Sequence, residues 1–89
     1  MKYGTVTPGS IFRHFKGNFY RVLDFAKHTE TGETMVVYRS IKDPDKIWVR
    51  PADMFFSKVD KTKYPEATQE MRFQLIVKGD GDEIQSGDF

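Results

Sequence analysis

Residues 19–27 read FYRVLDFAK, and the alternation within this stretch is the clearest strand signal in the chain. Successive side chains of a strand point to opposite faces, so even-numbered residues are expected on one face and odd-numbered residues on the other. Turn signals flank the stretch, at residues 16–18 with Gly17 and at residues 29–33 with Gly32. Glycine adopts the positive φ that tight turns require. The stretch therefore predicts a strand with a hairpin turn at each end.

Similar patterns elsewhere predict further short strands, at residues 11–15, 35–40, 47–50, 55–59 and 71–78. Proline has no N–H to give to a strand ladder and is preset for the start of a helix. Pro51 therefore predicts one helical turn over residues 51–54. Residues 65–73 fit a helix as well as a strand, and the pattern alone leaves both alternatives open.

The composition agrees with a strand-rich protein. The chain of 89 residues has 8 Phe, 4 Tyr and 1 Trp, and such residues favour strands. Five or six short antiparallel strands at regular spacing predict an all-β fold, a small barrel with one helical turn. We expect residues 1–78 to form this single domain, with a loose lead-in over residues 1–9, and residues 79–89 to form a flexible acidic tail.

The charge and the cysteine content of the chain exclude several classes of protein and of binding site. Lys and Arg number 14 against 13 Asp and Glu, so the net charge is only +1. Residues 1–63 hold 12 of the basic and 7 of the acidic residues, so a basic body precedes an acidic end. With no cysteine, the chain forms no disulfide or thiolate zinc site. No apolar run is long enough to cross a membrane or to act as a signal peptide, so we expect a cytoplasmic protein.

The sequence holds no catalytic or phosphate-binding signature such as G-x-S-x-G or a P-loop. The only candidate bases near neutral pH are His14 and His28, which could meet across a hairpin. A metal site needs three or four ligands, so the plainer interpretation is that each histidine donates one hydrogen bond and packs beside an aromatic ring. Asp80 begins a stretch similar to a calcium loop, but Ile84 stands where an oxygen ligand is needed. We expect no enzyme activity, no metal and no cofactor.

The remaining functional signal is a set of basic residues interleaved with aromatic ones. Aromatic rings stack on nucleobases, and arginine grips phosphates or carboxylates with its fork of donors. The candidate ligand-binding residues are Arg13, His14, Lys16, Tyr20, His28, Tyr38, Arg39, Trp48 and Arg50. The structural alternative is that Trp48 and Tyr38 belong to the core and that Arg50 pairs with Asp24 or Asp53.

Five motifs occur in order along the chain: His14-Phe15-Lys16-Gly17-Asn18, Ala26-Lys27-His28-Thr29-Glu30-Thr31, Val36-Val37-Tyr38-Arg39, Trp48-Val49-Arg50-Pro51 and Met54-Phe55. Together they resemble a family of short bacterial and phage proteins known as domain of unknown function 1653. The resemblance covers about residues 9–59, with a weaker match at Arg72-Phe73. It implies a small SH3-like β-barrel and brings no settled activity. Phe12 and Lys42 stand where tyrosine is common in the family.

Two functions fit these observations. The first is a non-enzymatic binding module for an anionic aromatic ligand: a nucleotide, a nucleotide-derived signal or single-stranded nucleic acid, as in a phage protein that sequesters a host signal. Duplex DNA is not expected, because its binding depends on neutralising many phosphates and the net charge is near zero. The alternative is an SH3-like module that binds a peptide partner or forms homo-oligomers. Neither function involves a membrane.

Overall fold

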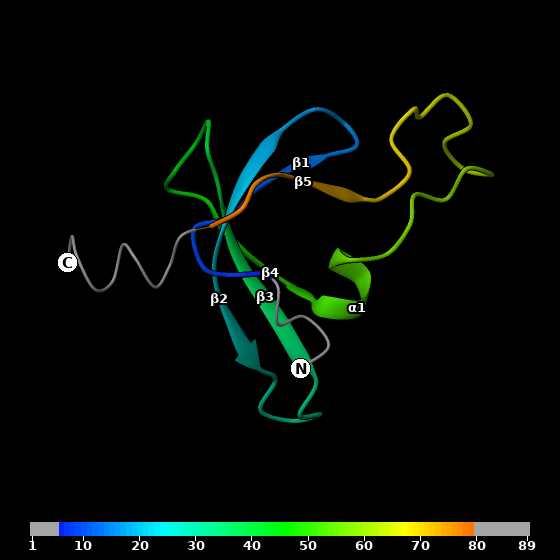
Figure 1. Ribbon diagram of the computed structural model, residues 1–89. Helices are drawn as coiled ribbons and strands as arrows, with labels where there is room; N and C mark the ends of the chain where they lie inside the picture. Colours follow the sequence, from blue (N-terminus) through cyan, green and yellow to red (C-terminus); the bar gives the residue numbers. More distant parts are fainter. Residues whose placement is uncertain (1–5, 80–89) are drawn as a thin grey trace.

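Five antiparallel strands form one sheet in the order β4-β3-β2-β1-β5 in the computed structural model, which describes residues 6–79 (Figure 1). The elements are β1 (Ile11–His14), β2 (Phe19–Lys27), β3 (Thr34–Ser40), β4 (Ile47–Pro51), α1 (Ala52–Phe55) and β5 (Phe73–Val77). The predicted all-β class is confirmed, and the predicted strand at residues 19–27 matches β2 to the residue. The one helix of the described part, four residues long, is too short to cross a membrane.

Two irregularities bend the sheet. In the pairing of β2 with β3, Val22 lies opposite Tyr38 and Asp24 lies opposite Val37, so Leu23 is an extra, unpaired residue. The pairing of β1 with β5 shifts in the same way next to Phe12. A bulge increases the local twist of a strand. The sheet therefore curves, and α1 covers one of its faces (Figure 1).

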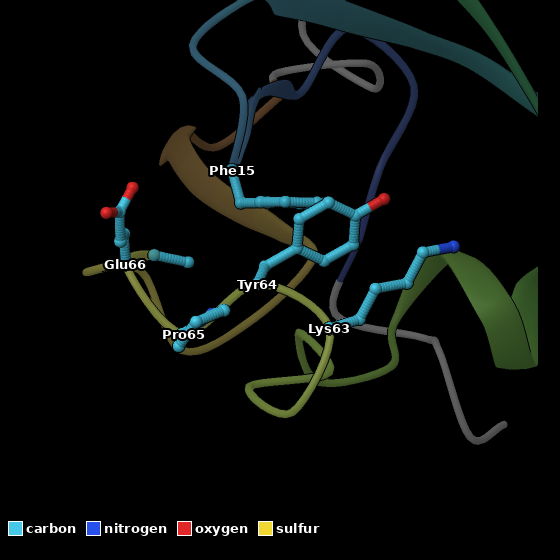
Figure 2. A pocket seen from close by; sticks show the side chains of 6 residues that line it. Phe15, Lys63, Tyr64, Pro65 and Glu66 are labelled. Carbon is cyan, nitrogen blue, oxygen red and sulfur yellow. The ribbon is translucent and has the colours of Figure 1, made fainter.

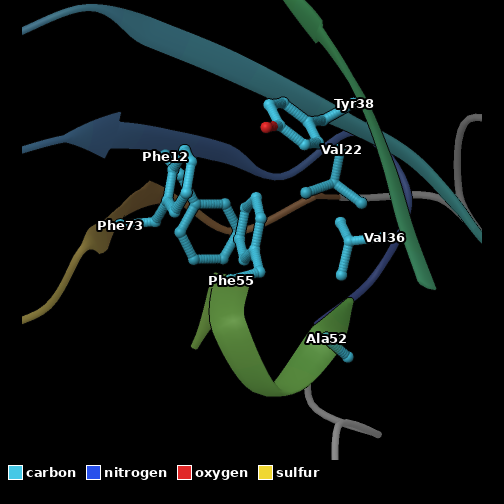
Figure 3. Close-up of a cluster of buried hydrophobic side chains, with 7 residues drawn as sticks. All are labelled: Phe12, Val22, Val36, Tyr38, Ala52, Phe55 and Phe73. Atoms are coloured by element: carbon cyan, nitrogen blue, oxygen red, sulfur yellow. The ribbon is translucent and has the colours of Figure 1, made fainter. Parts of the chain in front are cut away.

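The hydrophobic core lies between α1 and the covered face of the sheet (Figure 3). Its buried members are Phe12, Val22, Val36, Tyr38, Ala52, Phe55 and Phe73. The rings of Phe55 and Phe73 are stacked, with centroids 3.9 Å apart and an interplanar angle of 4°. Phe12 and Tyr38 meet Phe55 edge-on, with ring centroids 5.2 and 5.3 Å away. Four rings from three strands and the helix thus form the centre of the molecule.

The prediction of a strand at residues 55–59 is wrong. Phe55 is the last residue of α1 and is fully buried, and only Lys58 forms an isolated bridge, to Met71. The helix begins after Pro51, whose φ of −54° suits a helix start. One helical turn brings Phe55 back over the sheet, and burial of its ring outweighs the strand preference of the sequence around it.

Neither alternative for residues 65–73 is correct before Phe73, where β5 begins. Turns and irregular backbone fill this stretch, and the buried side chain of Gln69 holds it. The Gln69 amide donates hydrogen bonds to the carbonyls of Arg13 and Met71, at 2.9 and 2.8 Å. The contact with Arg13 joins residues far apart in the sequence, so no local pattern predicts it.

The expected loose lead-in is wrong for its described part, because a backbone hydrogen bond ties it to β2 and hydroxyl groups tie it to Gly79, just after β5. Gly9 N–H donates to the carbonyl of Val22 at 2.8 Å. Ser10 is fully buried, and its Oγ accepts a 2.7 Å hydrogen bond from Gly79 N–H. Thr7 Oγ1 donates to the Gly79 carbonyl. The residues beyond Gly79, for which an acidic tail is predicted, lie outside the described residues.

Gly79→Ala is expected to destabilise the protein by about 1–3 kcal/mol, since a side chain here overpacks a closed site. An added Cβ would collide with Pro8 and Ser10 and lie 2.7 Å from the Thr7 carbonyl oxygen. Urea denaturation measures the effect, with Lys78→Ala at the exposed neighbouring position as the control. Equal denaturation midpoints for the two variants would contradict this packing.

Candidate functional site

Six residues from all five strands line one small hollow, and five of them belong to the nine predicted ligand-binding residues. The hollow, called here the inner cavity, has a volume of about 170 Å³. Its lining residues are His14, Tyr20, Tyr38, Trp48, Arg50 and Phe73. Side chains from β1, β2, β3 and β4 that are scattered along the sequence thus come together at one place.

Strand pairing explains this convergence. Tyr38 lies opposite Trp48 across β3 and β4, and His14 lies opposite Phe73 across β1 and β5. Opposed residues of paired strands point to the same face. Tyr20 completes the set from β2, with its ring centroid 5.4 Å from Tyr38 and 5.8 Å from Phe73.

Arg50 is held in a fixed orientation by two aromatic residues. Its Nε donates a hydrogen bond to the Tyr38 hydroxyl at 3.3 Å, and its guanidinium carbon lies 5.8 Å from the Phe73 ring centroid. Within residues 6–79 the guanidinium makes only this one hydrogen bond, so its terminal nitrogens are available to an anion. Asp24, one of the acids considered as its partner, instead accepts a hydrogen bond from Phe25 N–H.

His14 is a neutral hydrogen-bond donor in the inner cavity. Burial, together with the positive charges of Arg50, Arg72 and Lys16, lowers its pKa from 6.5 to about 4. Its Nδ1 accepts a 3.1 Å hydrogen bond from Lys16 N–H. The single proton of the neutral ring therefore resides on Nε2. The ring packs edge-on against Phe73, with centroids 4.9 Å apart.

A second hollow, called here the outer cavity, adjoins the first. Its volume is about 430 Å³, and its lining residues are Asn18, Tyr20, Ser40, Lys42, Asp43, Lys46 and Trp48. Tyr20 and Trp48 line both cavities and therefore stand where the two meet. Trp48 is 48% exposed, so it is not a core residue. Tyr38, only 5% exposed, belongs to the core and to the inner cavity at once.

The other four predicted residues lie elsewhere. Arg13 and Arg39 alternate with His14 and Tyr38 along their strands and so occupy the opposite face of the sheet. Lys16 is in the turn after β1, with its Nζ 5.3 Å from the Tyr64 ring centroid.

Tyr64 itself lines a third hollow of about 390 Å³, shown in Figure 2 with Phe15, Lys63, Pro65 and Glu66. Its ring meets Phe15 edge-on, with centroids 4.9 Å apart. No residue of the predicted ligand-binding set lines this hollow.

The two histidines do not meet. His28 lies in the turn after β2, where its Nδ1 accepts hydrogen bonds from Glu30 and Thr31 N–H at 3.1 and 3.3 Å. It is separated from His14 by the length of β2, on the order of 30 Å for nine extended residues. His14 packs beside aromatic rings as the plainer interpretation expected, but both histidine rings accept hydrogen bonds through Nδ1, and His28 accepts two. Within residues 6–79 no three His, Asp or Glu side chains are grouped to hold a metal ion.

The predicted set does not include six of the residues that line the two cavities: Phe73, Asn18, Ser40, Lys42, Asp43 and Lys46. Phe73 was within reach, because Arg72-Phe73 is the weaker of the family-like motifs. Lys42 and Asn18 flank strands in turns, and a turn residue carries no periodic signal that would predict which cavity it lines.

Comparison with known proteins identifies the family of the chain. A family model described as "Protein of unknown function (DUF1653)" matches residues 10–75. The chain belongs to the DUF1653 family. The match extends past the predicted limit at residue 59 and includes Phe73, so the family model covers both the core rings and the inner cavity.

A crystal structure of a DUF1653 protein from Bordetella bronchiseptica is similar to this chain, with a TM-score of 0.67 and 28% sequence identity. The similarity covers 84% of this chain and 92% of that chain. No curated protein matches the chain. The DUF1653 fold is therefore shared over almost the whole length of both proteins.

His14→Asn is expected to flatten the loss of stability between pH 6.5 and about 4. In this window an unfolded histidine binds a proton while folded His14 stays neutral, so acidification favours the unfolded state of the wild type. Urea unfolding at several pH values, compared between the two proteins, measures the difference. Equal slopes, or an imidazole NMR titration of His14 centred near 6.5, would contradict the assigned environment.

Proposed function

We propose that this DUF1653 protein is a non-enzymatic binding module for an anionic, ring-bearing ligand: a nucleotide, a nucleotide-derived signal or a single nucleic-acid strand. One observation carries the proposal: Trp48, Tyr20 and Arg50 line the same hollow. In a phage, such a module would act in the host cytoplasm by sequestering a signalling nucleotide.

The ring-binding part of the proposal rests on Trp48 and Tyr20. A tryptophan that is 48% exposed at a cavity mouth offers a large apolar surface at little cost in ordering. Stacking of a base on an aromatic side chain contributes about 1–3 kcal/mol and tolerates any base. These two residues therefore suit a planar ring at the place where the cavities meet.

The anion-binding part rests on Arg50. Aromatic cages also recognise quaternary ammonium groups such as methylated lysine, by cation–π attraction. A guanidinium that donates into the same hollow repels such cations and attracts phosphate or carboxylate. Burial is the main cause of the low pKa of His14, and the positive charges of Arg50, Arg72 and Lys16 lower it further, in line with a positive potential in this hollow.

The chemistry of the inner cavity supports binding over catalysis. No carboxylate occurs among its described lining residues. The Nδ1 atom of His14 is occupied by the Lys16 N–H, and its lowered pKa makes the ring a weak base. A general base needs a pKa near the working pH and a free nitrogen within reach of a proton.

Trp48→Ala and Arg50→Gln are each expected to weaken nucleotide binding by about 5- to 100-fold, because each removes a contact of about 1–3 kcal/mol. Arg13→Gln, a matched change on the opposite face, is expected to leave binding unchanged. Thermal-shift screening followed by calorimetry at low salt measures the effects. The panel comprises the four nucleoside monophosphates, cyclic dinucleotides and oligo-dT.

The dependence of binding on salt concentration is an independent check of the proposed anion contact. Binding carried by exposed charges weakens as ionic strength rises, because the screening length falls to about 8 Å near physiological salt. Failure of every ligand in the panel to shift the melting temperature, or equal losses in the Arg13 and Arg50 variants, would refute the proposal.

A second candidate function is self-association or peptide binding along a sheet edge. The sheet order leaves β4 and β5 at its two edges, each unpaired on one side within residues 6–79. Ile47 and Val49 of β4 are 54% and 59% exposed, and Val77 of β5 is 53% exposed. An open edge with apolar side chains accepts an added strand.

If this second function holds, light scattering should show a mass above the monomer that falls on Val49→Glu. A buried charge at a strand-pairing interface is costly to desolvate. Thr68→Glu, on an exposed loop, serves as the control. A wild-type protein that is monomeric at all concentrations and does not respond to Val49→Glu rules out edge association.

A further inference from the structure

We infer that the ring held by this site is guanine, with its O6 and N7 edge on Arg50 in the inner cavity and its phosphate over Lys42 in the outer cavity. The inference rests on the proposed function and specifies its ligand, with one revision: Arg50, proposed above as the contact for the anion, binds the edge of the base, and Lys42 binds the phosphate. Three features of the described residues carry it: the sizes of the two cavities, the hydrogen-bonding groups of the inner one, and the charges of the outer one.

Size divides the ligand into two parts. The inner cavity, at about 170 Å³, is similar to the roughly 150 Å³ cavity that holds one benzene ring in an engineered protein. It therefore accepts the edge of a base and has no room for a whole nucleotide. The outer cavity, at about 430 Å³, has room for the sugar and phosphate. Tyr20 and Trp48, which line both, flank the ring between them.

Hydrogen-bonding groups select the base. The inner cavity presents donors: the terminal nitrogens of Arg50, the Nε2–H of His14 and the hydroxyl proton of Tyr38, whose oxygen already accepts from Arg50. None of its described lining side chains is an obligate acceptor. The tyrosine hydroxyls can also accept, but the two nitrogen-bearing side chains, Arg50 and His14, offer donors, so a ligand edge made of acceptors fits this lining best.

Guanine satisfies this requirement and adenine does not. Guanine has two adjacent acceptors, O6 and N7, whose spacing matches the fork of an arginine, whereas adenine places an amino donor beside its N7. The adenine amino group would face the Arg50 donors without a partner. Such a mismatch costs about 10- to 100-fold in affinity.

The charges of the outer cavity place the phosphate. Lys42 and Lys46 both line it, and Lys46 Nζ lies 3.7 Å from the Asp43 carboxylate. Lys42 has no salt bridge within residues 6–79 and is the cation left to meet a phosphate. Asn18 and Ser40 line the same cavity and supply neutral donors for the sugar and phosphate oxygens.

The test is calorimetry on the full chain with four probes: GMP, IMP, AMP and guanosine. GMP and IMP, which share O6 and N7, are expected to bind alike and about 10- to 100-fold more tightly than AMP. Guanosine, without phosphate, is expected to bind more weakly than GMP and to show little salt dependence.

Three variants separate the two ends of the ligand. Arg50→Lys keeps the charge but loses the fork, so the preference for GMP over AMP should fall toward unity. Lys42→Ala should weaken GMP and AMP equally and leave guanosine unchanged. Arg39→Lys, on the opposite sheet face, should change none of these values. Thermal melting of each variant reports whether the fold is retained.

The outcomes distinguish this inference from the proposed function. Equal binding of GMP and AMP, or an equal loss of both in Arg50→Lys, overturns the guanine assignment and leaves an unselective nucleotide site with its phosphate on Arg50. Failure of all four probes, together with the rest of the nucleotide panel, overturns the proposed function itself. A GMP preference that vanishes only in Arg50→Lys supports the inference.

Discussion

The stacked rings of Phe55 and Phe73 are the contact on which the remaining structure depends. Their centroids lie 3.9 Å apart, and both side chains are buried. Phe55 ends the helical turn that follows β4, and Phe73 begins β5, so this contact joins α1 to the far edge strand of the sheet. A four-residue helix has little stability of its own, so α1 is held over the sheet by this stack together with the edge-on contacts of Phe55 with Phe12 and Tyr38.

The same contact places the candidate site. Arg50 immediately precedes Pro51 and α1, and its guanidinium lies over Phe73, so the stack that fixes the helix also fixes the arginine. Tyr38 accepts the Arg50 hydrogen bond and packs edge-on against Phe55. Core and cavity therefore share residues. Side chains that are already packed in the core lose little conformational entropy when a ligand binds. This is the physical meaning of preorganisation.

The division of the nine predicted residues follows from strand geometry. His14, Tyr20, Tyr38 and Trp48 share the covered face, while Arg13 and Arg39 alternate with them and occupy the other face. The alternation of side chains between the two faces can be read from the sequence of each strand by itself. Which face of each strand would be covered depends on the register between strands, and the bulge at Leu23 shifts that register within β2.

The sequence alone was enough to predict the all-β class, the bounds of β2, the turns at Gly17 and Gly32, and the family of the chain. The family follows from the order of the five motifs, and the other features depend on local backbone preferences and side-chain alternation, which can be read from the sequence. Only the tertiary structure decided that Phe55 ends a helix, that Gln69 holds an irregular stretch and that Phe73 joins Arg50 in one cavity. Each of these depends on a contact between distant residues, whose free energy outweighs the local preference of the chain around it.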